Sequence, residues 1–179
     1  MGPFSEGLAH VKVKNKFGYI NKQGKFVIRP RFKNAEPFSE GLAEIAMSSY
    51  TKVGFINREG EIVIRPKYFS VSRFSEGVAG ASPSLEERTG FIDKDENWVI
   101  EPRFDGEEPF SEGVARVYFE DQHGYVDMEG DWFVEPIFDS AESFVDGLAE
   151  VGVEEDDGLV ATGYIDREGY YLWEPTTKV

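Results

Sequence analysis

The sequence contains no cysteine and only two histidines, His10 and His123. The absence of cysteine excludes a disulfide framework, a thiol nucleophile and any metal site that needs thiolate ligands. Two histidines are too few for a histidine-rich metal centre. No apolar run approaches the roughly 20 residues of a membrane span, and the N-terminus has neither the basic segment nor the apolar run of a signal peptide. The compartment is left open between the cytoplasm and a fragment of an exported protein.

Positive charge is also scarce, because 34 acidic residues face 19 basic ones and the net charge is −15. That balance argues against binding of the whole chain to nucleic acid or to an anionic membrane. With 40% hydrophobic residues, the 179-residue chain can bury a core. We expect a single folded domain over residues 1–179.

A six-residue string recurs through the chain and defines its organisation. It reads Phe-Ser-Glu-Gly-Leu/Val-Ala, drifts to Phe-Val-Asp-Gly-Leu-Ala in the last copy, and is called the corner below. The corners begin at Phe4, Phe38, Phe74, Phe110 and Phe144. A second string, Gly-aromatic-Ile/Val-Asn/Asp, begins at Gly18, Gly54, Gly90, Gly124 and Gly163, and prolines follow at Pro30, Pro66, Pro102, Pro136 and Pro175. The chain is therefore an array of five repeats of 34–39 residues, at about 4–37, 38–73, 74–109, 110–143 and 144–179.

The spacing of these marks separates a fixed scaffold from one variable segment. The Gly of the second string always precedes the Pro by 12 residues, and that Pro precedes the next corner Phe by 8. All length changes fall between the two strings, in residues 10–17, 44–53, 80–89, 116–123 and 150–162. Insertions collect in exposed backbone, so we expect these segments to be hairpin tips along one edge of the array.

Each repeat is predicted to be a three-stranded β-meander. In the first repeat the strands are expected at 8–13, 17–21 and 26–28, where β-branched and aromatic residues dominate. An Asx-to-Gly turn, 21–24 and its copies, should join the last two strands, with the Gly at positive φ. The proline should end the pairing. The corner Gly should also have positive φ, and the five corner Phe side chains should form a buried ladder with one rung per repeat.

The predicted fold class is all-β. One small unit cannot bury its own apolar face, but stacked units can. We expect an open, solenoid-like array, because 34–39 residues is short for a four-stranded propeller blade. A closed five-bladed β-propeller is the alternative.

The joint order and spacing of the strings resemble the bacterial WG-repeat family, also called KWG repeats. The resemblance covers essentially the whole chain and implies an all-β repeat module, usually without an assigned activity. One departure stands out. The family's namesake Trp would precede each Gly of the second string, and this sequence instead has Phe17, Val53, Thr89, His123 and Thr162 there.

No catalytic, cofactor-binding or metal-binding residue is predicted. The corner Ser and Glu side chains recur in equivalent places, which favours a structural role, because a catalytic group is needed only once. Residues 93–97 begin like a calcium loop, but Trp98 replaces the required Gly and Phe104 the final Glu, so a hairpin turn is expected. Residues 154–158 form an acidic segment in the longest variable loop, where a solvated loop is more common than a weak calcium site. His123 is interpreted as a packing or surface residue.

Charge is unevenly distributed along the array, positive at its start and negative from the third repeat on. Cutting the sequence at the corner Phe residues gives net charges of +6, +1, −7, −8 and −7. The scaffold is nearly constant, so folding does not require this gradient. The gradient favours either head-to-tail contacts between copies or a basic patch in the first repeat that faces an acidic partner. The third alternative is random drift among surface residues with no function.

The first functional hypothesis is therefore a non-enzymatic scaffold that binds a protein or peptide through the variable hairpin tips. The candidate partner-binding residues are Tyr50, Tyr118, Phe119, Lys12, Lys14, Lys16, Glu154, Glu155, Asp156 and Asp157. The alternative is a carbohydrate or cell-envelope module, which predicts one exposed aromatic at an equivalent position in each repeat. An enzyme is the third and least favoured hypothesis.

Overall fold

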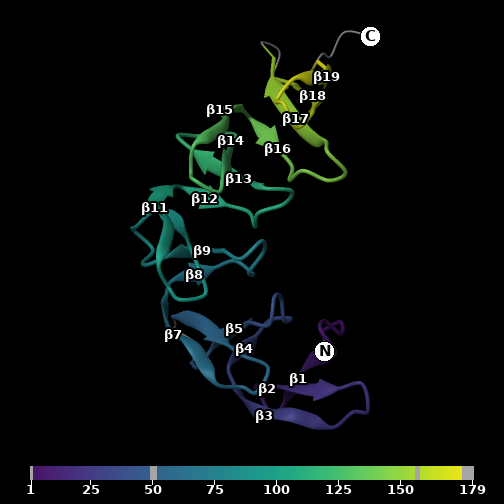
Figure 1. Cartoon of the computed structure of the whole chain (residues 1–179), viewed down its shortest axis with the longest axis vertical. Coiled ribbons are helices and arrows are strands. Elements are labelled where there is room, and N and C mark those ends of the chain that lie inside the picture. Colours follow the sequence, from purple (N-terminus) through teal and green to yellow (C-terminus); the bar gives the residue numbers. More distant parts are fainter. Residues whose placement is uncertain (1, 49–51, 156–157, 175–179) are drawn as a thin grey trace.

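The computed structural model describes residues 2–48, 52–155 and 158–174, and within them every regular element is a β-strand (Figure 1). The first sheet holds β1 (Leu8–Val13), β2 (Lys16–Asn21) and β3 (Phe26–Phe32). The second holds β4 (Asn34–Ala35), β5 (Ala43–Ala46), β6 (Val53–Ile56) and β7 (Ile62–Tyr68). The third holds β8 (Ser70–Val71), β9 (Ala79–Ser82), β10 (Thr89–Ile92) and β11 (Trp98–Phe104). The fourth holds β12 (Gly106–Glu107), β13 (Val114–Phe119), β14 (Gln122–Asp127) and β15 (Trp132–Phe138). The fifth holds β16 (Ser140–Ala141), β17 (Ala149–Glu154), β18 (Val160–Ile165) and β19 (Tyr171–Trp173). All pairs are antiparallel.

The predicted all-β array of five units is confirmed, with one addition to the meander. Sheets two to five each carry a fourth, two-residue strand (β4, β8, β12 and β16). This strand comes from the segment between the proline and the corner, so it precedes the corner that opens its own sheet. In sheet two the backbone N–H of Glu36 donates to the carbonyl of Glu44 at 3.1 Å. The segment between the proline and the corner thus forms a strand, because it runs beside the first long strand of the next repeat and pairs with it.

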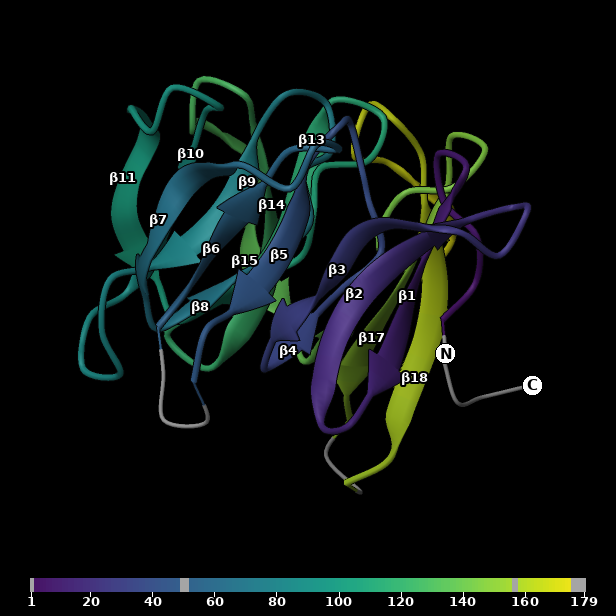
Figure 2. The same ribbon diagram turned by 90° about the horizontal axis from the view of Figure 1, so that it is seen from below.

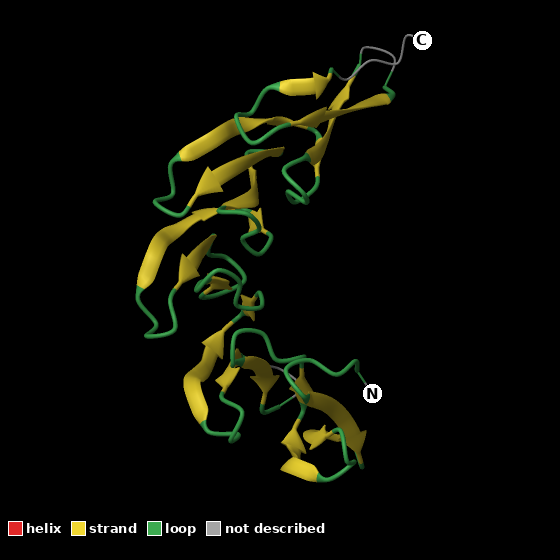
Figure 3. Cartoon of the chain, turned by 45° about the vertical axis from the view of Figure 1, so that its right-hand side comes forward, coloured by secondary structure: helices red, strands yellow, loops and turns green. Residues whose placement is uncertain are grey.

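The five sheets follow one another along an open arc, and the first and last do not meet to close a ring (Figures 1 and 3). Strands β7 and β11 lie on the convex side of the arc, and the short strands lie toward its concave side (Figure 1). The open array is therefore the arrangement observed.

The core is divided into four clusters, each between two successive sheets. At the first junction, Tyr19 and Ile28 of sheet one pack against Phe38 and Ile45 of sheet two. The corner residues Phe38, Phe74, Phe110 and Phe144 are almost fully buried. The prediction of a fifth buried rung is wrong, because Phe4 is 48% exposed. Each buried rung packs against the preceding sheet, and no described sheet lies on that side of Phe4.

The prediction that the proline ends strand pairing is also wrong. Strand β3 runs through Pro30 to Phe32, and the β2–β3 register shifts between the pairs Phe17–Phe32 and Tyr19–Ile28. The proline lies in this bulge, where a missing donor costs no ladder bond. A Cβ on Gly18 would lie 2.6 Å from the nitrogen of Pro30. The constant spacing from Gly to Pro therefore reflects backbone contact across the bulge.

The two kinds of hairpin lie at opposite ends of each central strand, because antiparallel neighbours join it once at each end. In Figure 2 the β1–β2 hairpin points to the lower edge of the array. Its turn residues Lys14 and Asn15 both have positive φ, and so do Glu120 and Asp121 in sheet four. Positive φ at both positions is the signature of a two-residue type I′ turn, which explains why these two variable segments are the shortest. In the opposite turns, Gly24 and its counterparts have the predicted positive φ.

Candidate functional site

The corner polar residues connect each repeat to the next, as a structural role predicts. The Ser39 hydroxyl donates to the carbonyl of Phe74 at 2.7 Å, and the Glu40 carboxylate accepts the N–H of Gly77 at 3.1 Å. The other serine bonds are Ser5 to Phe38, Ser75 to Phe110 and Ser111 to Phe144. The other carboxylate bonds are Gly41 to Glu6, Gly113 to Glu76 and Gly147 to Glu112. The hydroxyl and carboxylate groups of the corners are therefore engaged in hydrogen bonds between successive repeats.

A basic side chain on the following Asx-to-Gly turn braces three of these corners. The Arg58 guanidinium donates to the carbonyl of Glu6 at 2.8 Å. Lys94 lies 3.1 Å from the Glu40 carboxylate and also reaches its carbonyl. Arg167 donates to the carbonyl of Glu112. Each contact joins a corner to the turn of the next sheet, so it fixes the relative position of two repeats.

The candidate basic residues lie at the tip of the first sheet. Lys12, Lys14 and Lys16 are exposed on the β1–β2 hairpin. The Lys12 ammonium lies 5.5 Å from the centroid of the Phe17 ring. Phe17 occupies the position of the family Trp, so this hairpin combines positive charge with a half-buried aromatic surface.

The two candidate aromatics of sheet four differ in accessibility. Tyr118 is half-buried, with its ring 4.9 Å from His123 and its hydroxyl bonded to Asp121. Phe119 packs against the core, with its ring 5.7 Å from that of Trp132. Burial is the main cause that lowers the pKa of His123, followed by Arg116. The imidazole is therefore favoured in its neutral form.

The candidate acidic residues lie in the longest variable loop. Glu154 is exposed at the end of β17, and the backbone N–H of Glu155 donates to the carbonyl of Leu159. Tyr50, Asp156 and Asp157 lie outside the described residues. The calcium-like segment is a hairpin turn, because the Asp93 carboxylate accepts the backbone N–H groups of Asp95 and Asn97. Among the described residues, no group of three or more acidic or histidine side chains is arranged to hold a metal ion.

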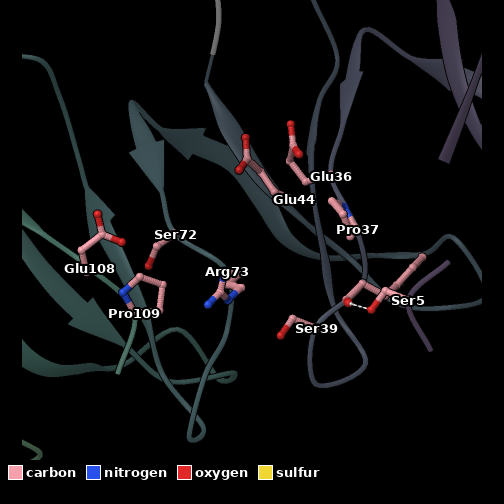
Figure 4. Close-up of a pocket in the computed structure, with 10 residues that line it drawn as sticks. Ser5, Glu36, Pro37, Ser39, Glu44, Ser72, Arg73, Glu108 and Pro109 are labelled. Carbon is pink, nitrogen blue, oxygen red and sulfur yellow. Dashed lines mark hydrogen bonds between the residues drawn. The ribbon is translucent and has the colours of Figure 1, made fainter. Parts of the chain in front are cut away.

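A cavity of about 570 Å³ lies among the segments that follow the short strands (Figure 4), which are on the concave side of the arc in Figure 1. Most of its walls come from the segments that follow the short strands β4, β8 and β12 of three successive sheets, and Ser5 of the first corner and Glu44 of β5 complete them. The lining residues include Glu36, Glu44, Ser72, Arg73 and Glu108. In Figure 4, Glu36 and Glu44 lie on one side of the cavity and Ser72, Arg73 and Glu108 on the other.

The cavity lining carries three carboxylates, those of Glu36, Glu44 and Glu108, and one guanidinium, that of Arg73. Burial, and then the neighbouring Glu36 carboxylate, raise the pKa of Glu44 to about 7. The Glu108 carboxylate is paired with Arg116 at 2.8 Å. A cation beside Glu44 would hold that carboxylate in its charged form. The sequence analysis did not predict any of these cavity residues as binding residues, because it favoured the variable hairpins.

A second buried carboxylate lies close to the cavity, at the junction of sheets three and four. Glu107 occupies a position where sheets two and five have alanine, and its side chain fills the space that a Cβ on Gly80 would need. Burial is the main cause that raises the pKa of Glu107 to about 7. The Ser72 hydroxyl, which hydrogen-bonds it, opposes that shift. The absence of a side chain at Gly80 therefore leaves the space that the Glu107 side chain fills.

The comparisons with known proteins agree on a β-repeat fold. The sequence profile described as "WG containing repeat" matches residues 17–47, 54–82, 90–121 and 124–155. These segments cover four of the second strings, and the fifth, at Gly163, lies beyond them. No curated protein matches this chain. No helix among the described residues is long and apolar enough to cross a membrane.

Two solved structures resemble this fold over most of the chain. A crystal structure of a eukaryotic initiation factor is 10% identical with a TM-score of 0.62, and the match covers 95% of this chain and 52% of that chain. A streptogramin B lyase structure is 15% identical with a TM-score of 0.51, covering 98% of this chain and 67% of that one. The chain thus spans about half the length of the initiation factor. At these identities the likeness concerns the fold alone.

Proposed function

This chain belongs to the WG-containing-repeat family, and from that premise we propose that it is a scaffold that binds a protein or peptide partner and catalyses no reaction. The observation that carries the proposal is the concave cavity, which three successive sheets build together. Its neighbouring carboxylates, Glu36 and Glu44, suit a basic segment of the partner. An extended chain can run across several repeats, as partners of other repeat arrays do on concave surfaces.

The variable hairpin edge is the second part of this proposed surface. Its segments differ in length and charge from repeat to repeat, while the scaffold between them stays constant. Lys12, Lys14 and Lys16 give the first hairpin a positive charge, and Glu154 gives the last a negative one. Recognition by this edge would make specificity depend on residues that the fold does not need.

The observed packing gives little support to the carbohydrate alternative. Aromatic residues do recur at the start of the outer strands, as Phe26, Trp98, Trp132 and Tyr171. The last three pack edge-on against an aromatic of the preceding repeat, for example Trp98 against Tyr68 with ring centroids 6.2 Å apart. Rings engaged at a junction do not offer the free flat face that a sugar platform requires.

A random peptide display library tests the proposal without assuming a ligand. We expect basic sequences to be enriched, and their binding to weaken as salt rises. The double change Glu36→Gln and Glu44→Gln should reduce affinity about tenfold. The matched control is Glu59→Gln with Glu61→Gln, which removes the same charge from the turn after β6. Absence of any enriched sequence, or binding that neither the cavity variant nor hairpin variants affect, would contradict the proposal.

Head-to-tail association between copies, which the charge gradient suggests, is a separate proposal. It uses the two ends of the array instead of the cavity or the hairpin edge.

A further inference from the structure

The four sheet junctions share one aromatic contact. The aromatic residue of the second string in one sheet packs against the corner Phe of the next. The four pairs, with ring centroids 4.8–5.0 Å apart, are Tyr19–Phe38, Phe55–Phe74, Phe91–Phe110 and Tyr125–Phe144. The first residue of each pair lies on the forward face of its sheet, which packs against the following sheet. The second lies on the backward face of its sheet, which packs against the preceding sheet.

Two rings of the same series have no such partner among the described residues. Phe4 is the backward-facing ring of sheet one and is 48% exposed, whereas its counterparts are almost fully buried. Tyr164 is the forward-facing ring of sheet five and is 42% exposed, whereas its counterparts are fully buried. Phe26 and Trp173, which lie on the same two sheets, are also exposed. Sheet one therefore exposes the kind of aromatic residue that a backward face buries at the internal junctions, and sheet five exposes the kind that a forward face buries there.

We infer that these two faces bind each other between two copies of this chain, so that Tyr164 of one copy packs against Phe4 of the next. The geometry of the contact is that of the four internal junctions. This inference goes beyond the proposed partner binding and does not depend on it. The two faces do not pair with each other within one chain, because the two ends of the arc lie apart (Figure 1).

Charge complementarity supports this choice of occupant. The first repeat carries a net charge of +6 and the last −7. At three internal junctions a basic turn residue contacts the preceding corner, as Lys94 contacts Glu40 at 3.1 Å. The equivalent positions at the two ends are Lys22 in the first turn and Asp146 in the last corner. A contact between copies would therefore place Lys22 beside Asp146.

One residue makes the proposed junction weaker than the internal ones. Val145 stands where the other corners have Ser, and Val145 is exposed. It cannot donate to the carbonyl of Phe4 as Ser39 donates to that of Phe74. The contact between copies should therefore be reversible, and restoring the serine should strengthen it. A head-to-tail contact is heterologous, so it produces either a closed ring or an open chain.

Sedimentation equilibrium over a wide range of protein concentrations tests this inference directly. At low salt we expect association that increases with concentration, and Lys22→Glu and Asp146→Lys should each weaken it about tenfold. The double variant restores the opposite charges and should recover most of the affinity. Phe4→Ala should weaken association to a similar degree, and Val145→Ser should strengthen it several-fold.

Lys14→Glu is the matched control, because it makes the same charge change in the same sheet but at the hairpin tip. It should leave association unchanged, and circular dichroism should show that every variant is folded. A closed dimer and a series of longer oligomers would both support the inference. A monomer at all concentrations would overturn it, and so would association that Phe4→Ala and the charge-swap variants leave unaffected. Neither result would bear on the peptide-binding test, which is read from the cavity variants Glu36→Gln and Glu44→Gln.

Discussion

The hydroxyl of Ser39 donates a 2.7 Å hydrogen bond to the carbonyl oxygen of Phe74, the first residue of the next corner. The bond joins the same string in two successive repeats, 35 residues apart. It shows why the corner is retained along the chain. Each corner fixes the position of the next corner. The repeated Ser and Glu side chains therefore stabilise the array, and their polar groups are already hydrogen-bonded within it.

Removing this bond should cost stability but not the fold. Ser39→Ala leaves the carbonyl of Phe74 without its donor at a half-buried site, and we expect the free energy of unfolding to fall by about 1 kcal/mol. Urea denaturation measures the change. Val145→Ala is the matched control, since the valine side chain at this equivalent corner position donates no hydrogen bond. Equal losses in the two variants would show that the bond contributes nothing specific.

The glycine opposite each proline should not tolerate a side chain. A Cβ on Gly54 would lie 2.6 Å from the nitrogen of Pro66. It would lie closer still to the carbonyl oxygen of Ile64. Gly54→Ala should therefore destabilise the protein by about 3 kcal/mol or more, because both of these atoms belong to the backbone and cannot move aside easily. Gly106→Ala is the control, also in a strand, where the nearest atom is the Cβ of Tyr118 at 3.6 Å. Thermal unfolding of the two variants decides the point, and similar melting temperatures would contradict the bulge argument.

The buried Glu107 should make stability depend on pH. Its pKa is raised to about 7 in the folded protein, against an ordinary value of 4.5. The folded state then binds the proton more tightly than the unfolded state, so this group reduces stability as pH rises from about 4.5 to about 7. Glu107→Gln should flatten that fall and be more stable than the parent by about 1–3 kcal/mol at pH 8. Parallel pH curves of unfolding free energy for the two proteins would refute this.

Binding of a basic peptide in the concave cavity should weaken on acidification. Glu44 has a pKa raised to about 7 by burial and by Glu36. Protonation below that value removes one of the negative charges that a cationic segment would contact. We expect affinity for a basic peptide selected from the library to fall between about pH 8 and pH 6 in the parent, and to be nearly constant in Glu44→Gln. Fluorescence anisotropy at constant ionic strength gives both curves.

The sequence predicted the scaffold because local rules determine it. Fixed spacing, alternating strands and the Gly positions of the turns all depend on neighbours close in the chain, as at Gly24. Other features depend on how sheets stack. Glu40 adopts positive φ beside the corner Gly, and its carboxylate reaches the next corner, which no local pattern reveals. Phe4 breaks the buried ladder for the same reason, because burial belongs to the junction and not to the string.

The candidate site was harder to predict for a related reason. Glu36, Ser72 and Glu108 occupy equivalent positions in segments of constant length, where the sequence draws no attention to them. Only the curvature of the array brings these segments around one cavity. Phe119 shows the converse, since it lies in a variable segment but packs against Trp132. Variation in length was a sound guide to exposed hairpins and a poor guide to the concave surface.

The most direct test of the open arc is small-angle X-ray scattering from dilute protein at high salt, because dilution and the screening of the opposite end charges both weaken contacts between copies. A compact 179-residue chain has a radius of gyration of about 16 Å. The open arc predicts a clearly larger value, together with a distance distribution that extends beyond that of a compact particle. A radius of gyration near 16 Å would contradict the account. The sheets would then close on themselves, and neither the concave surface nor the two end faces would be open to a partner.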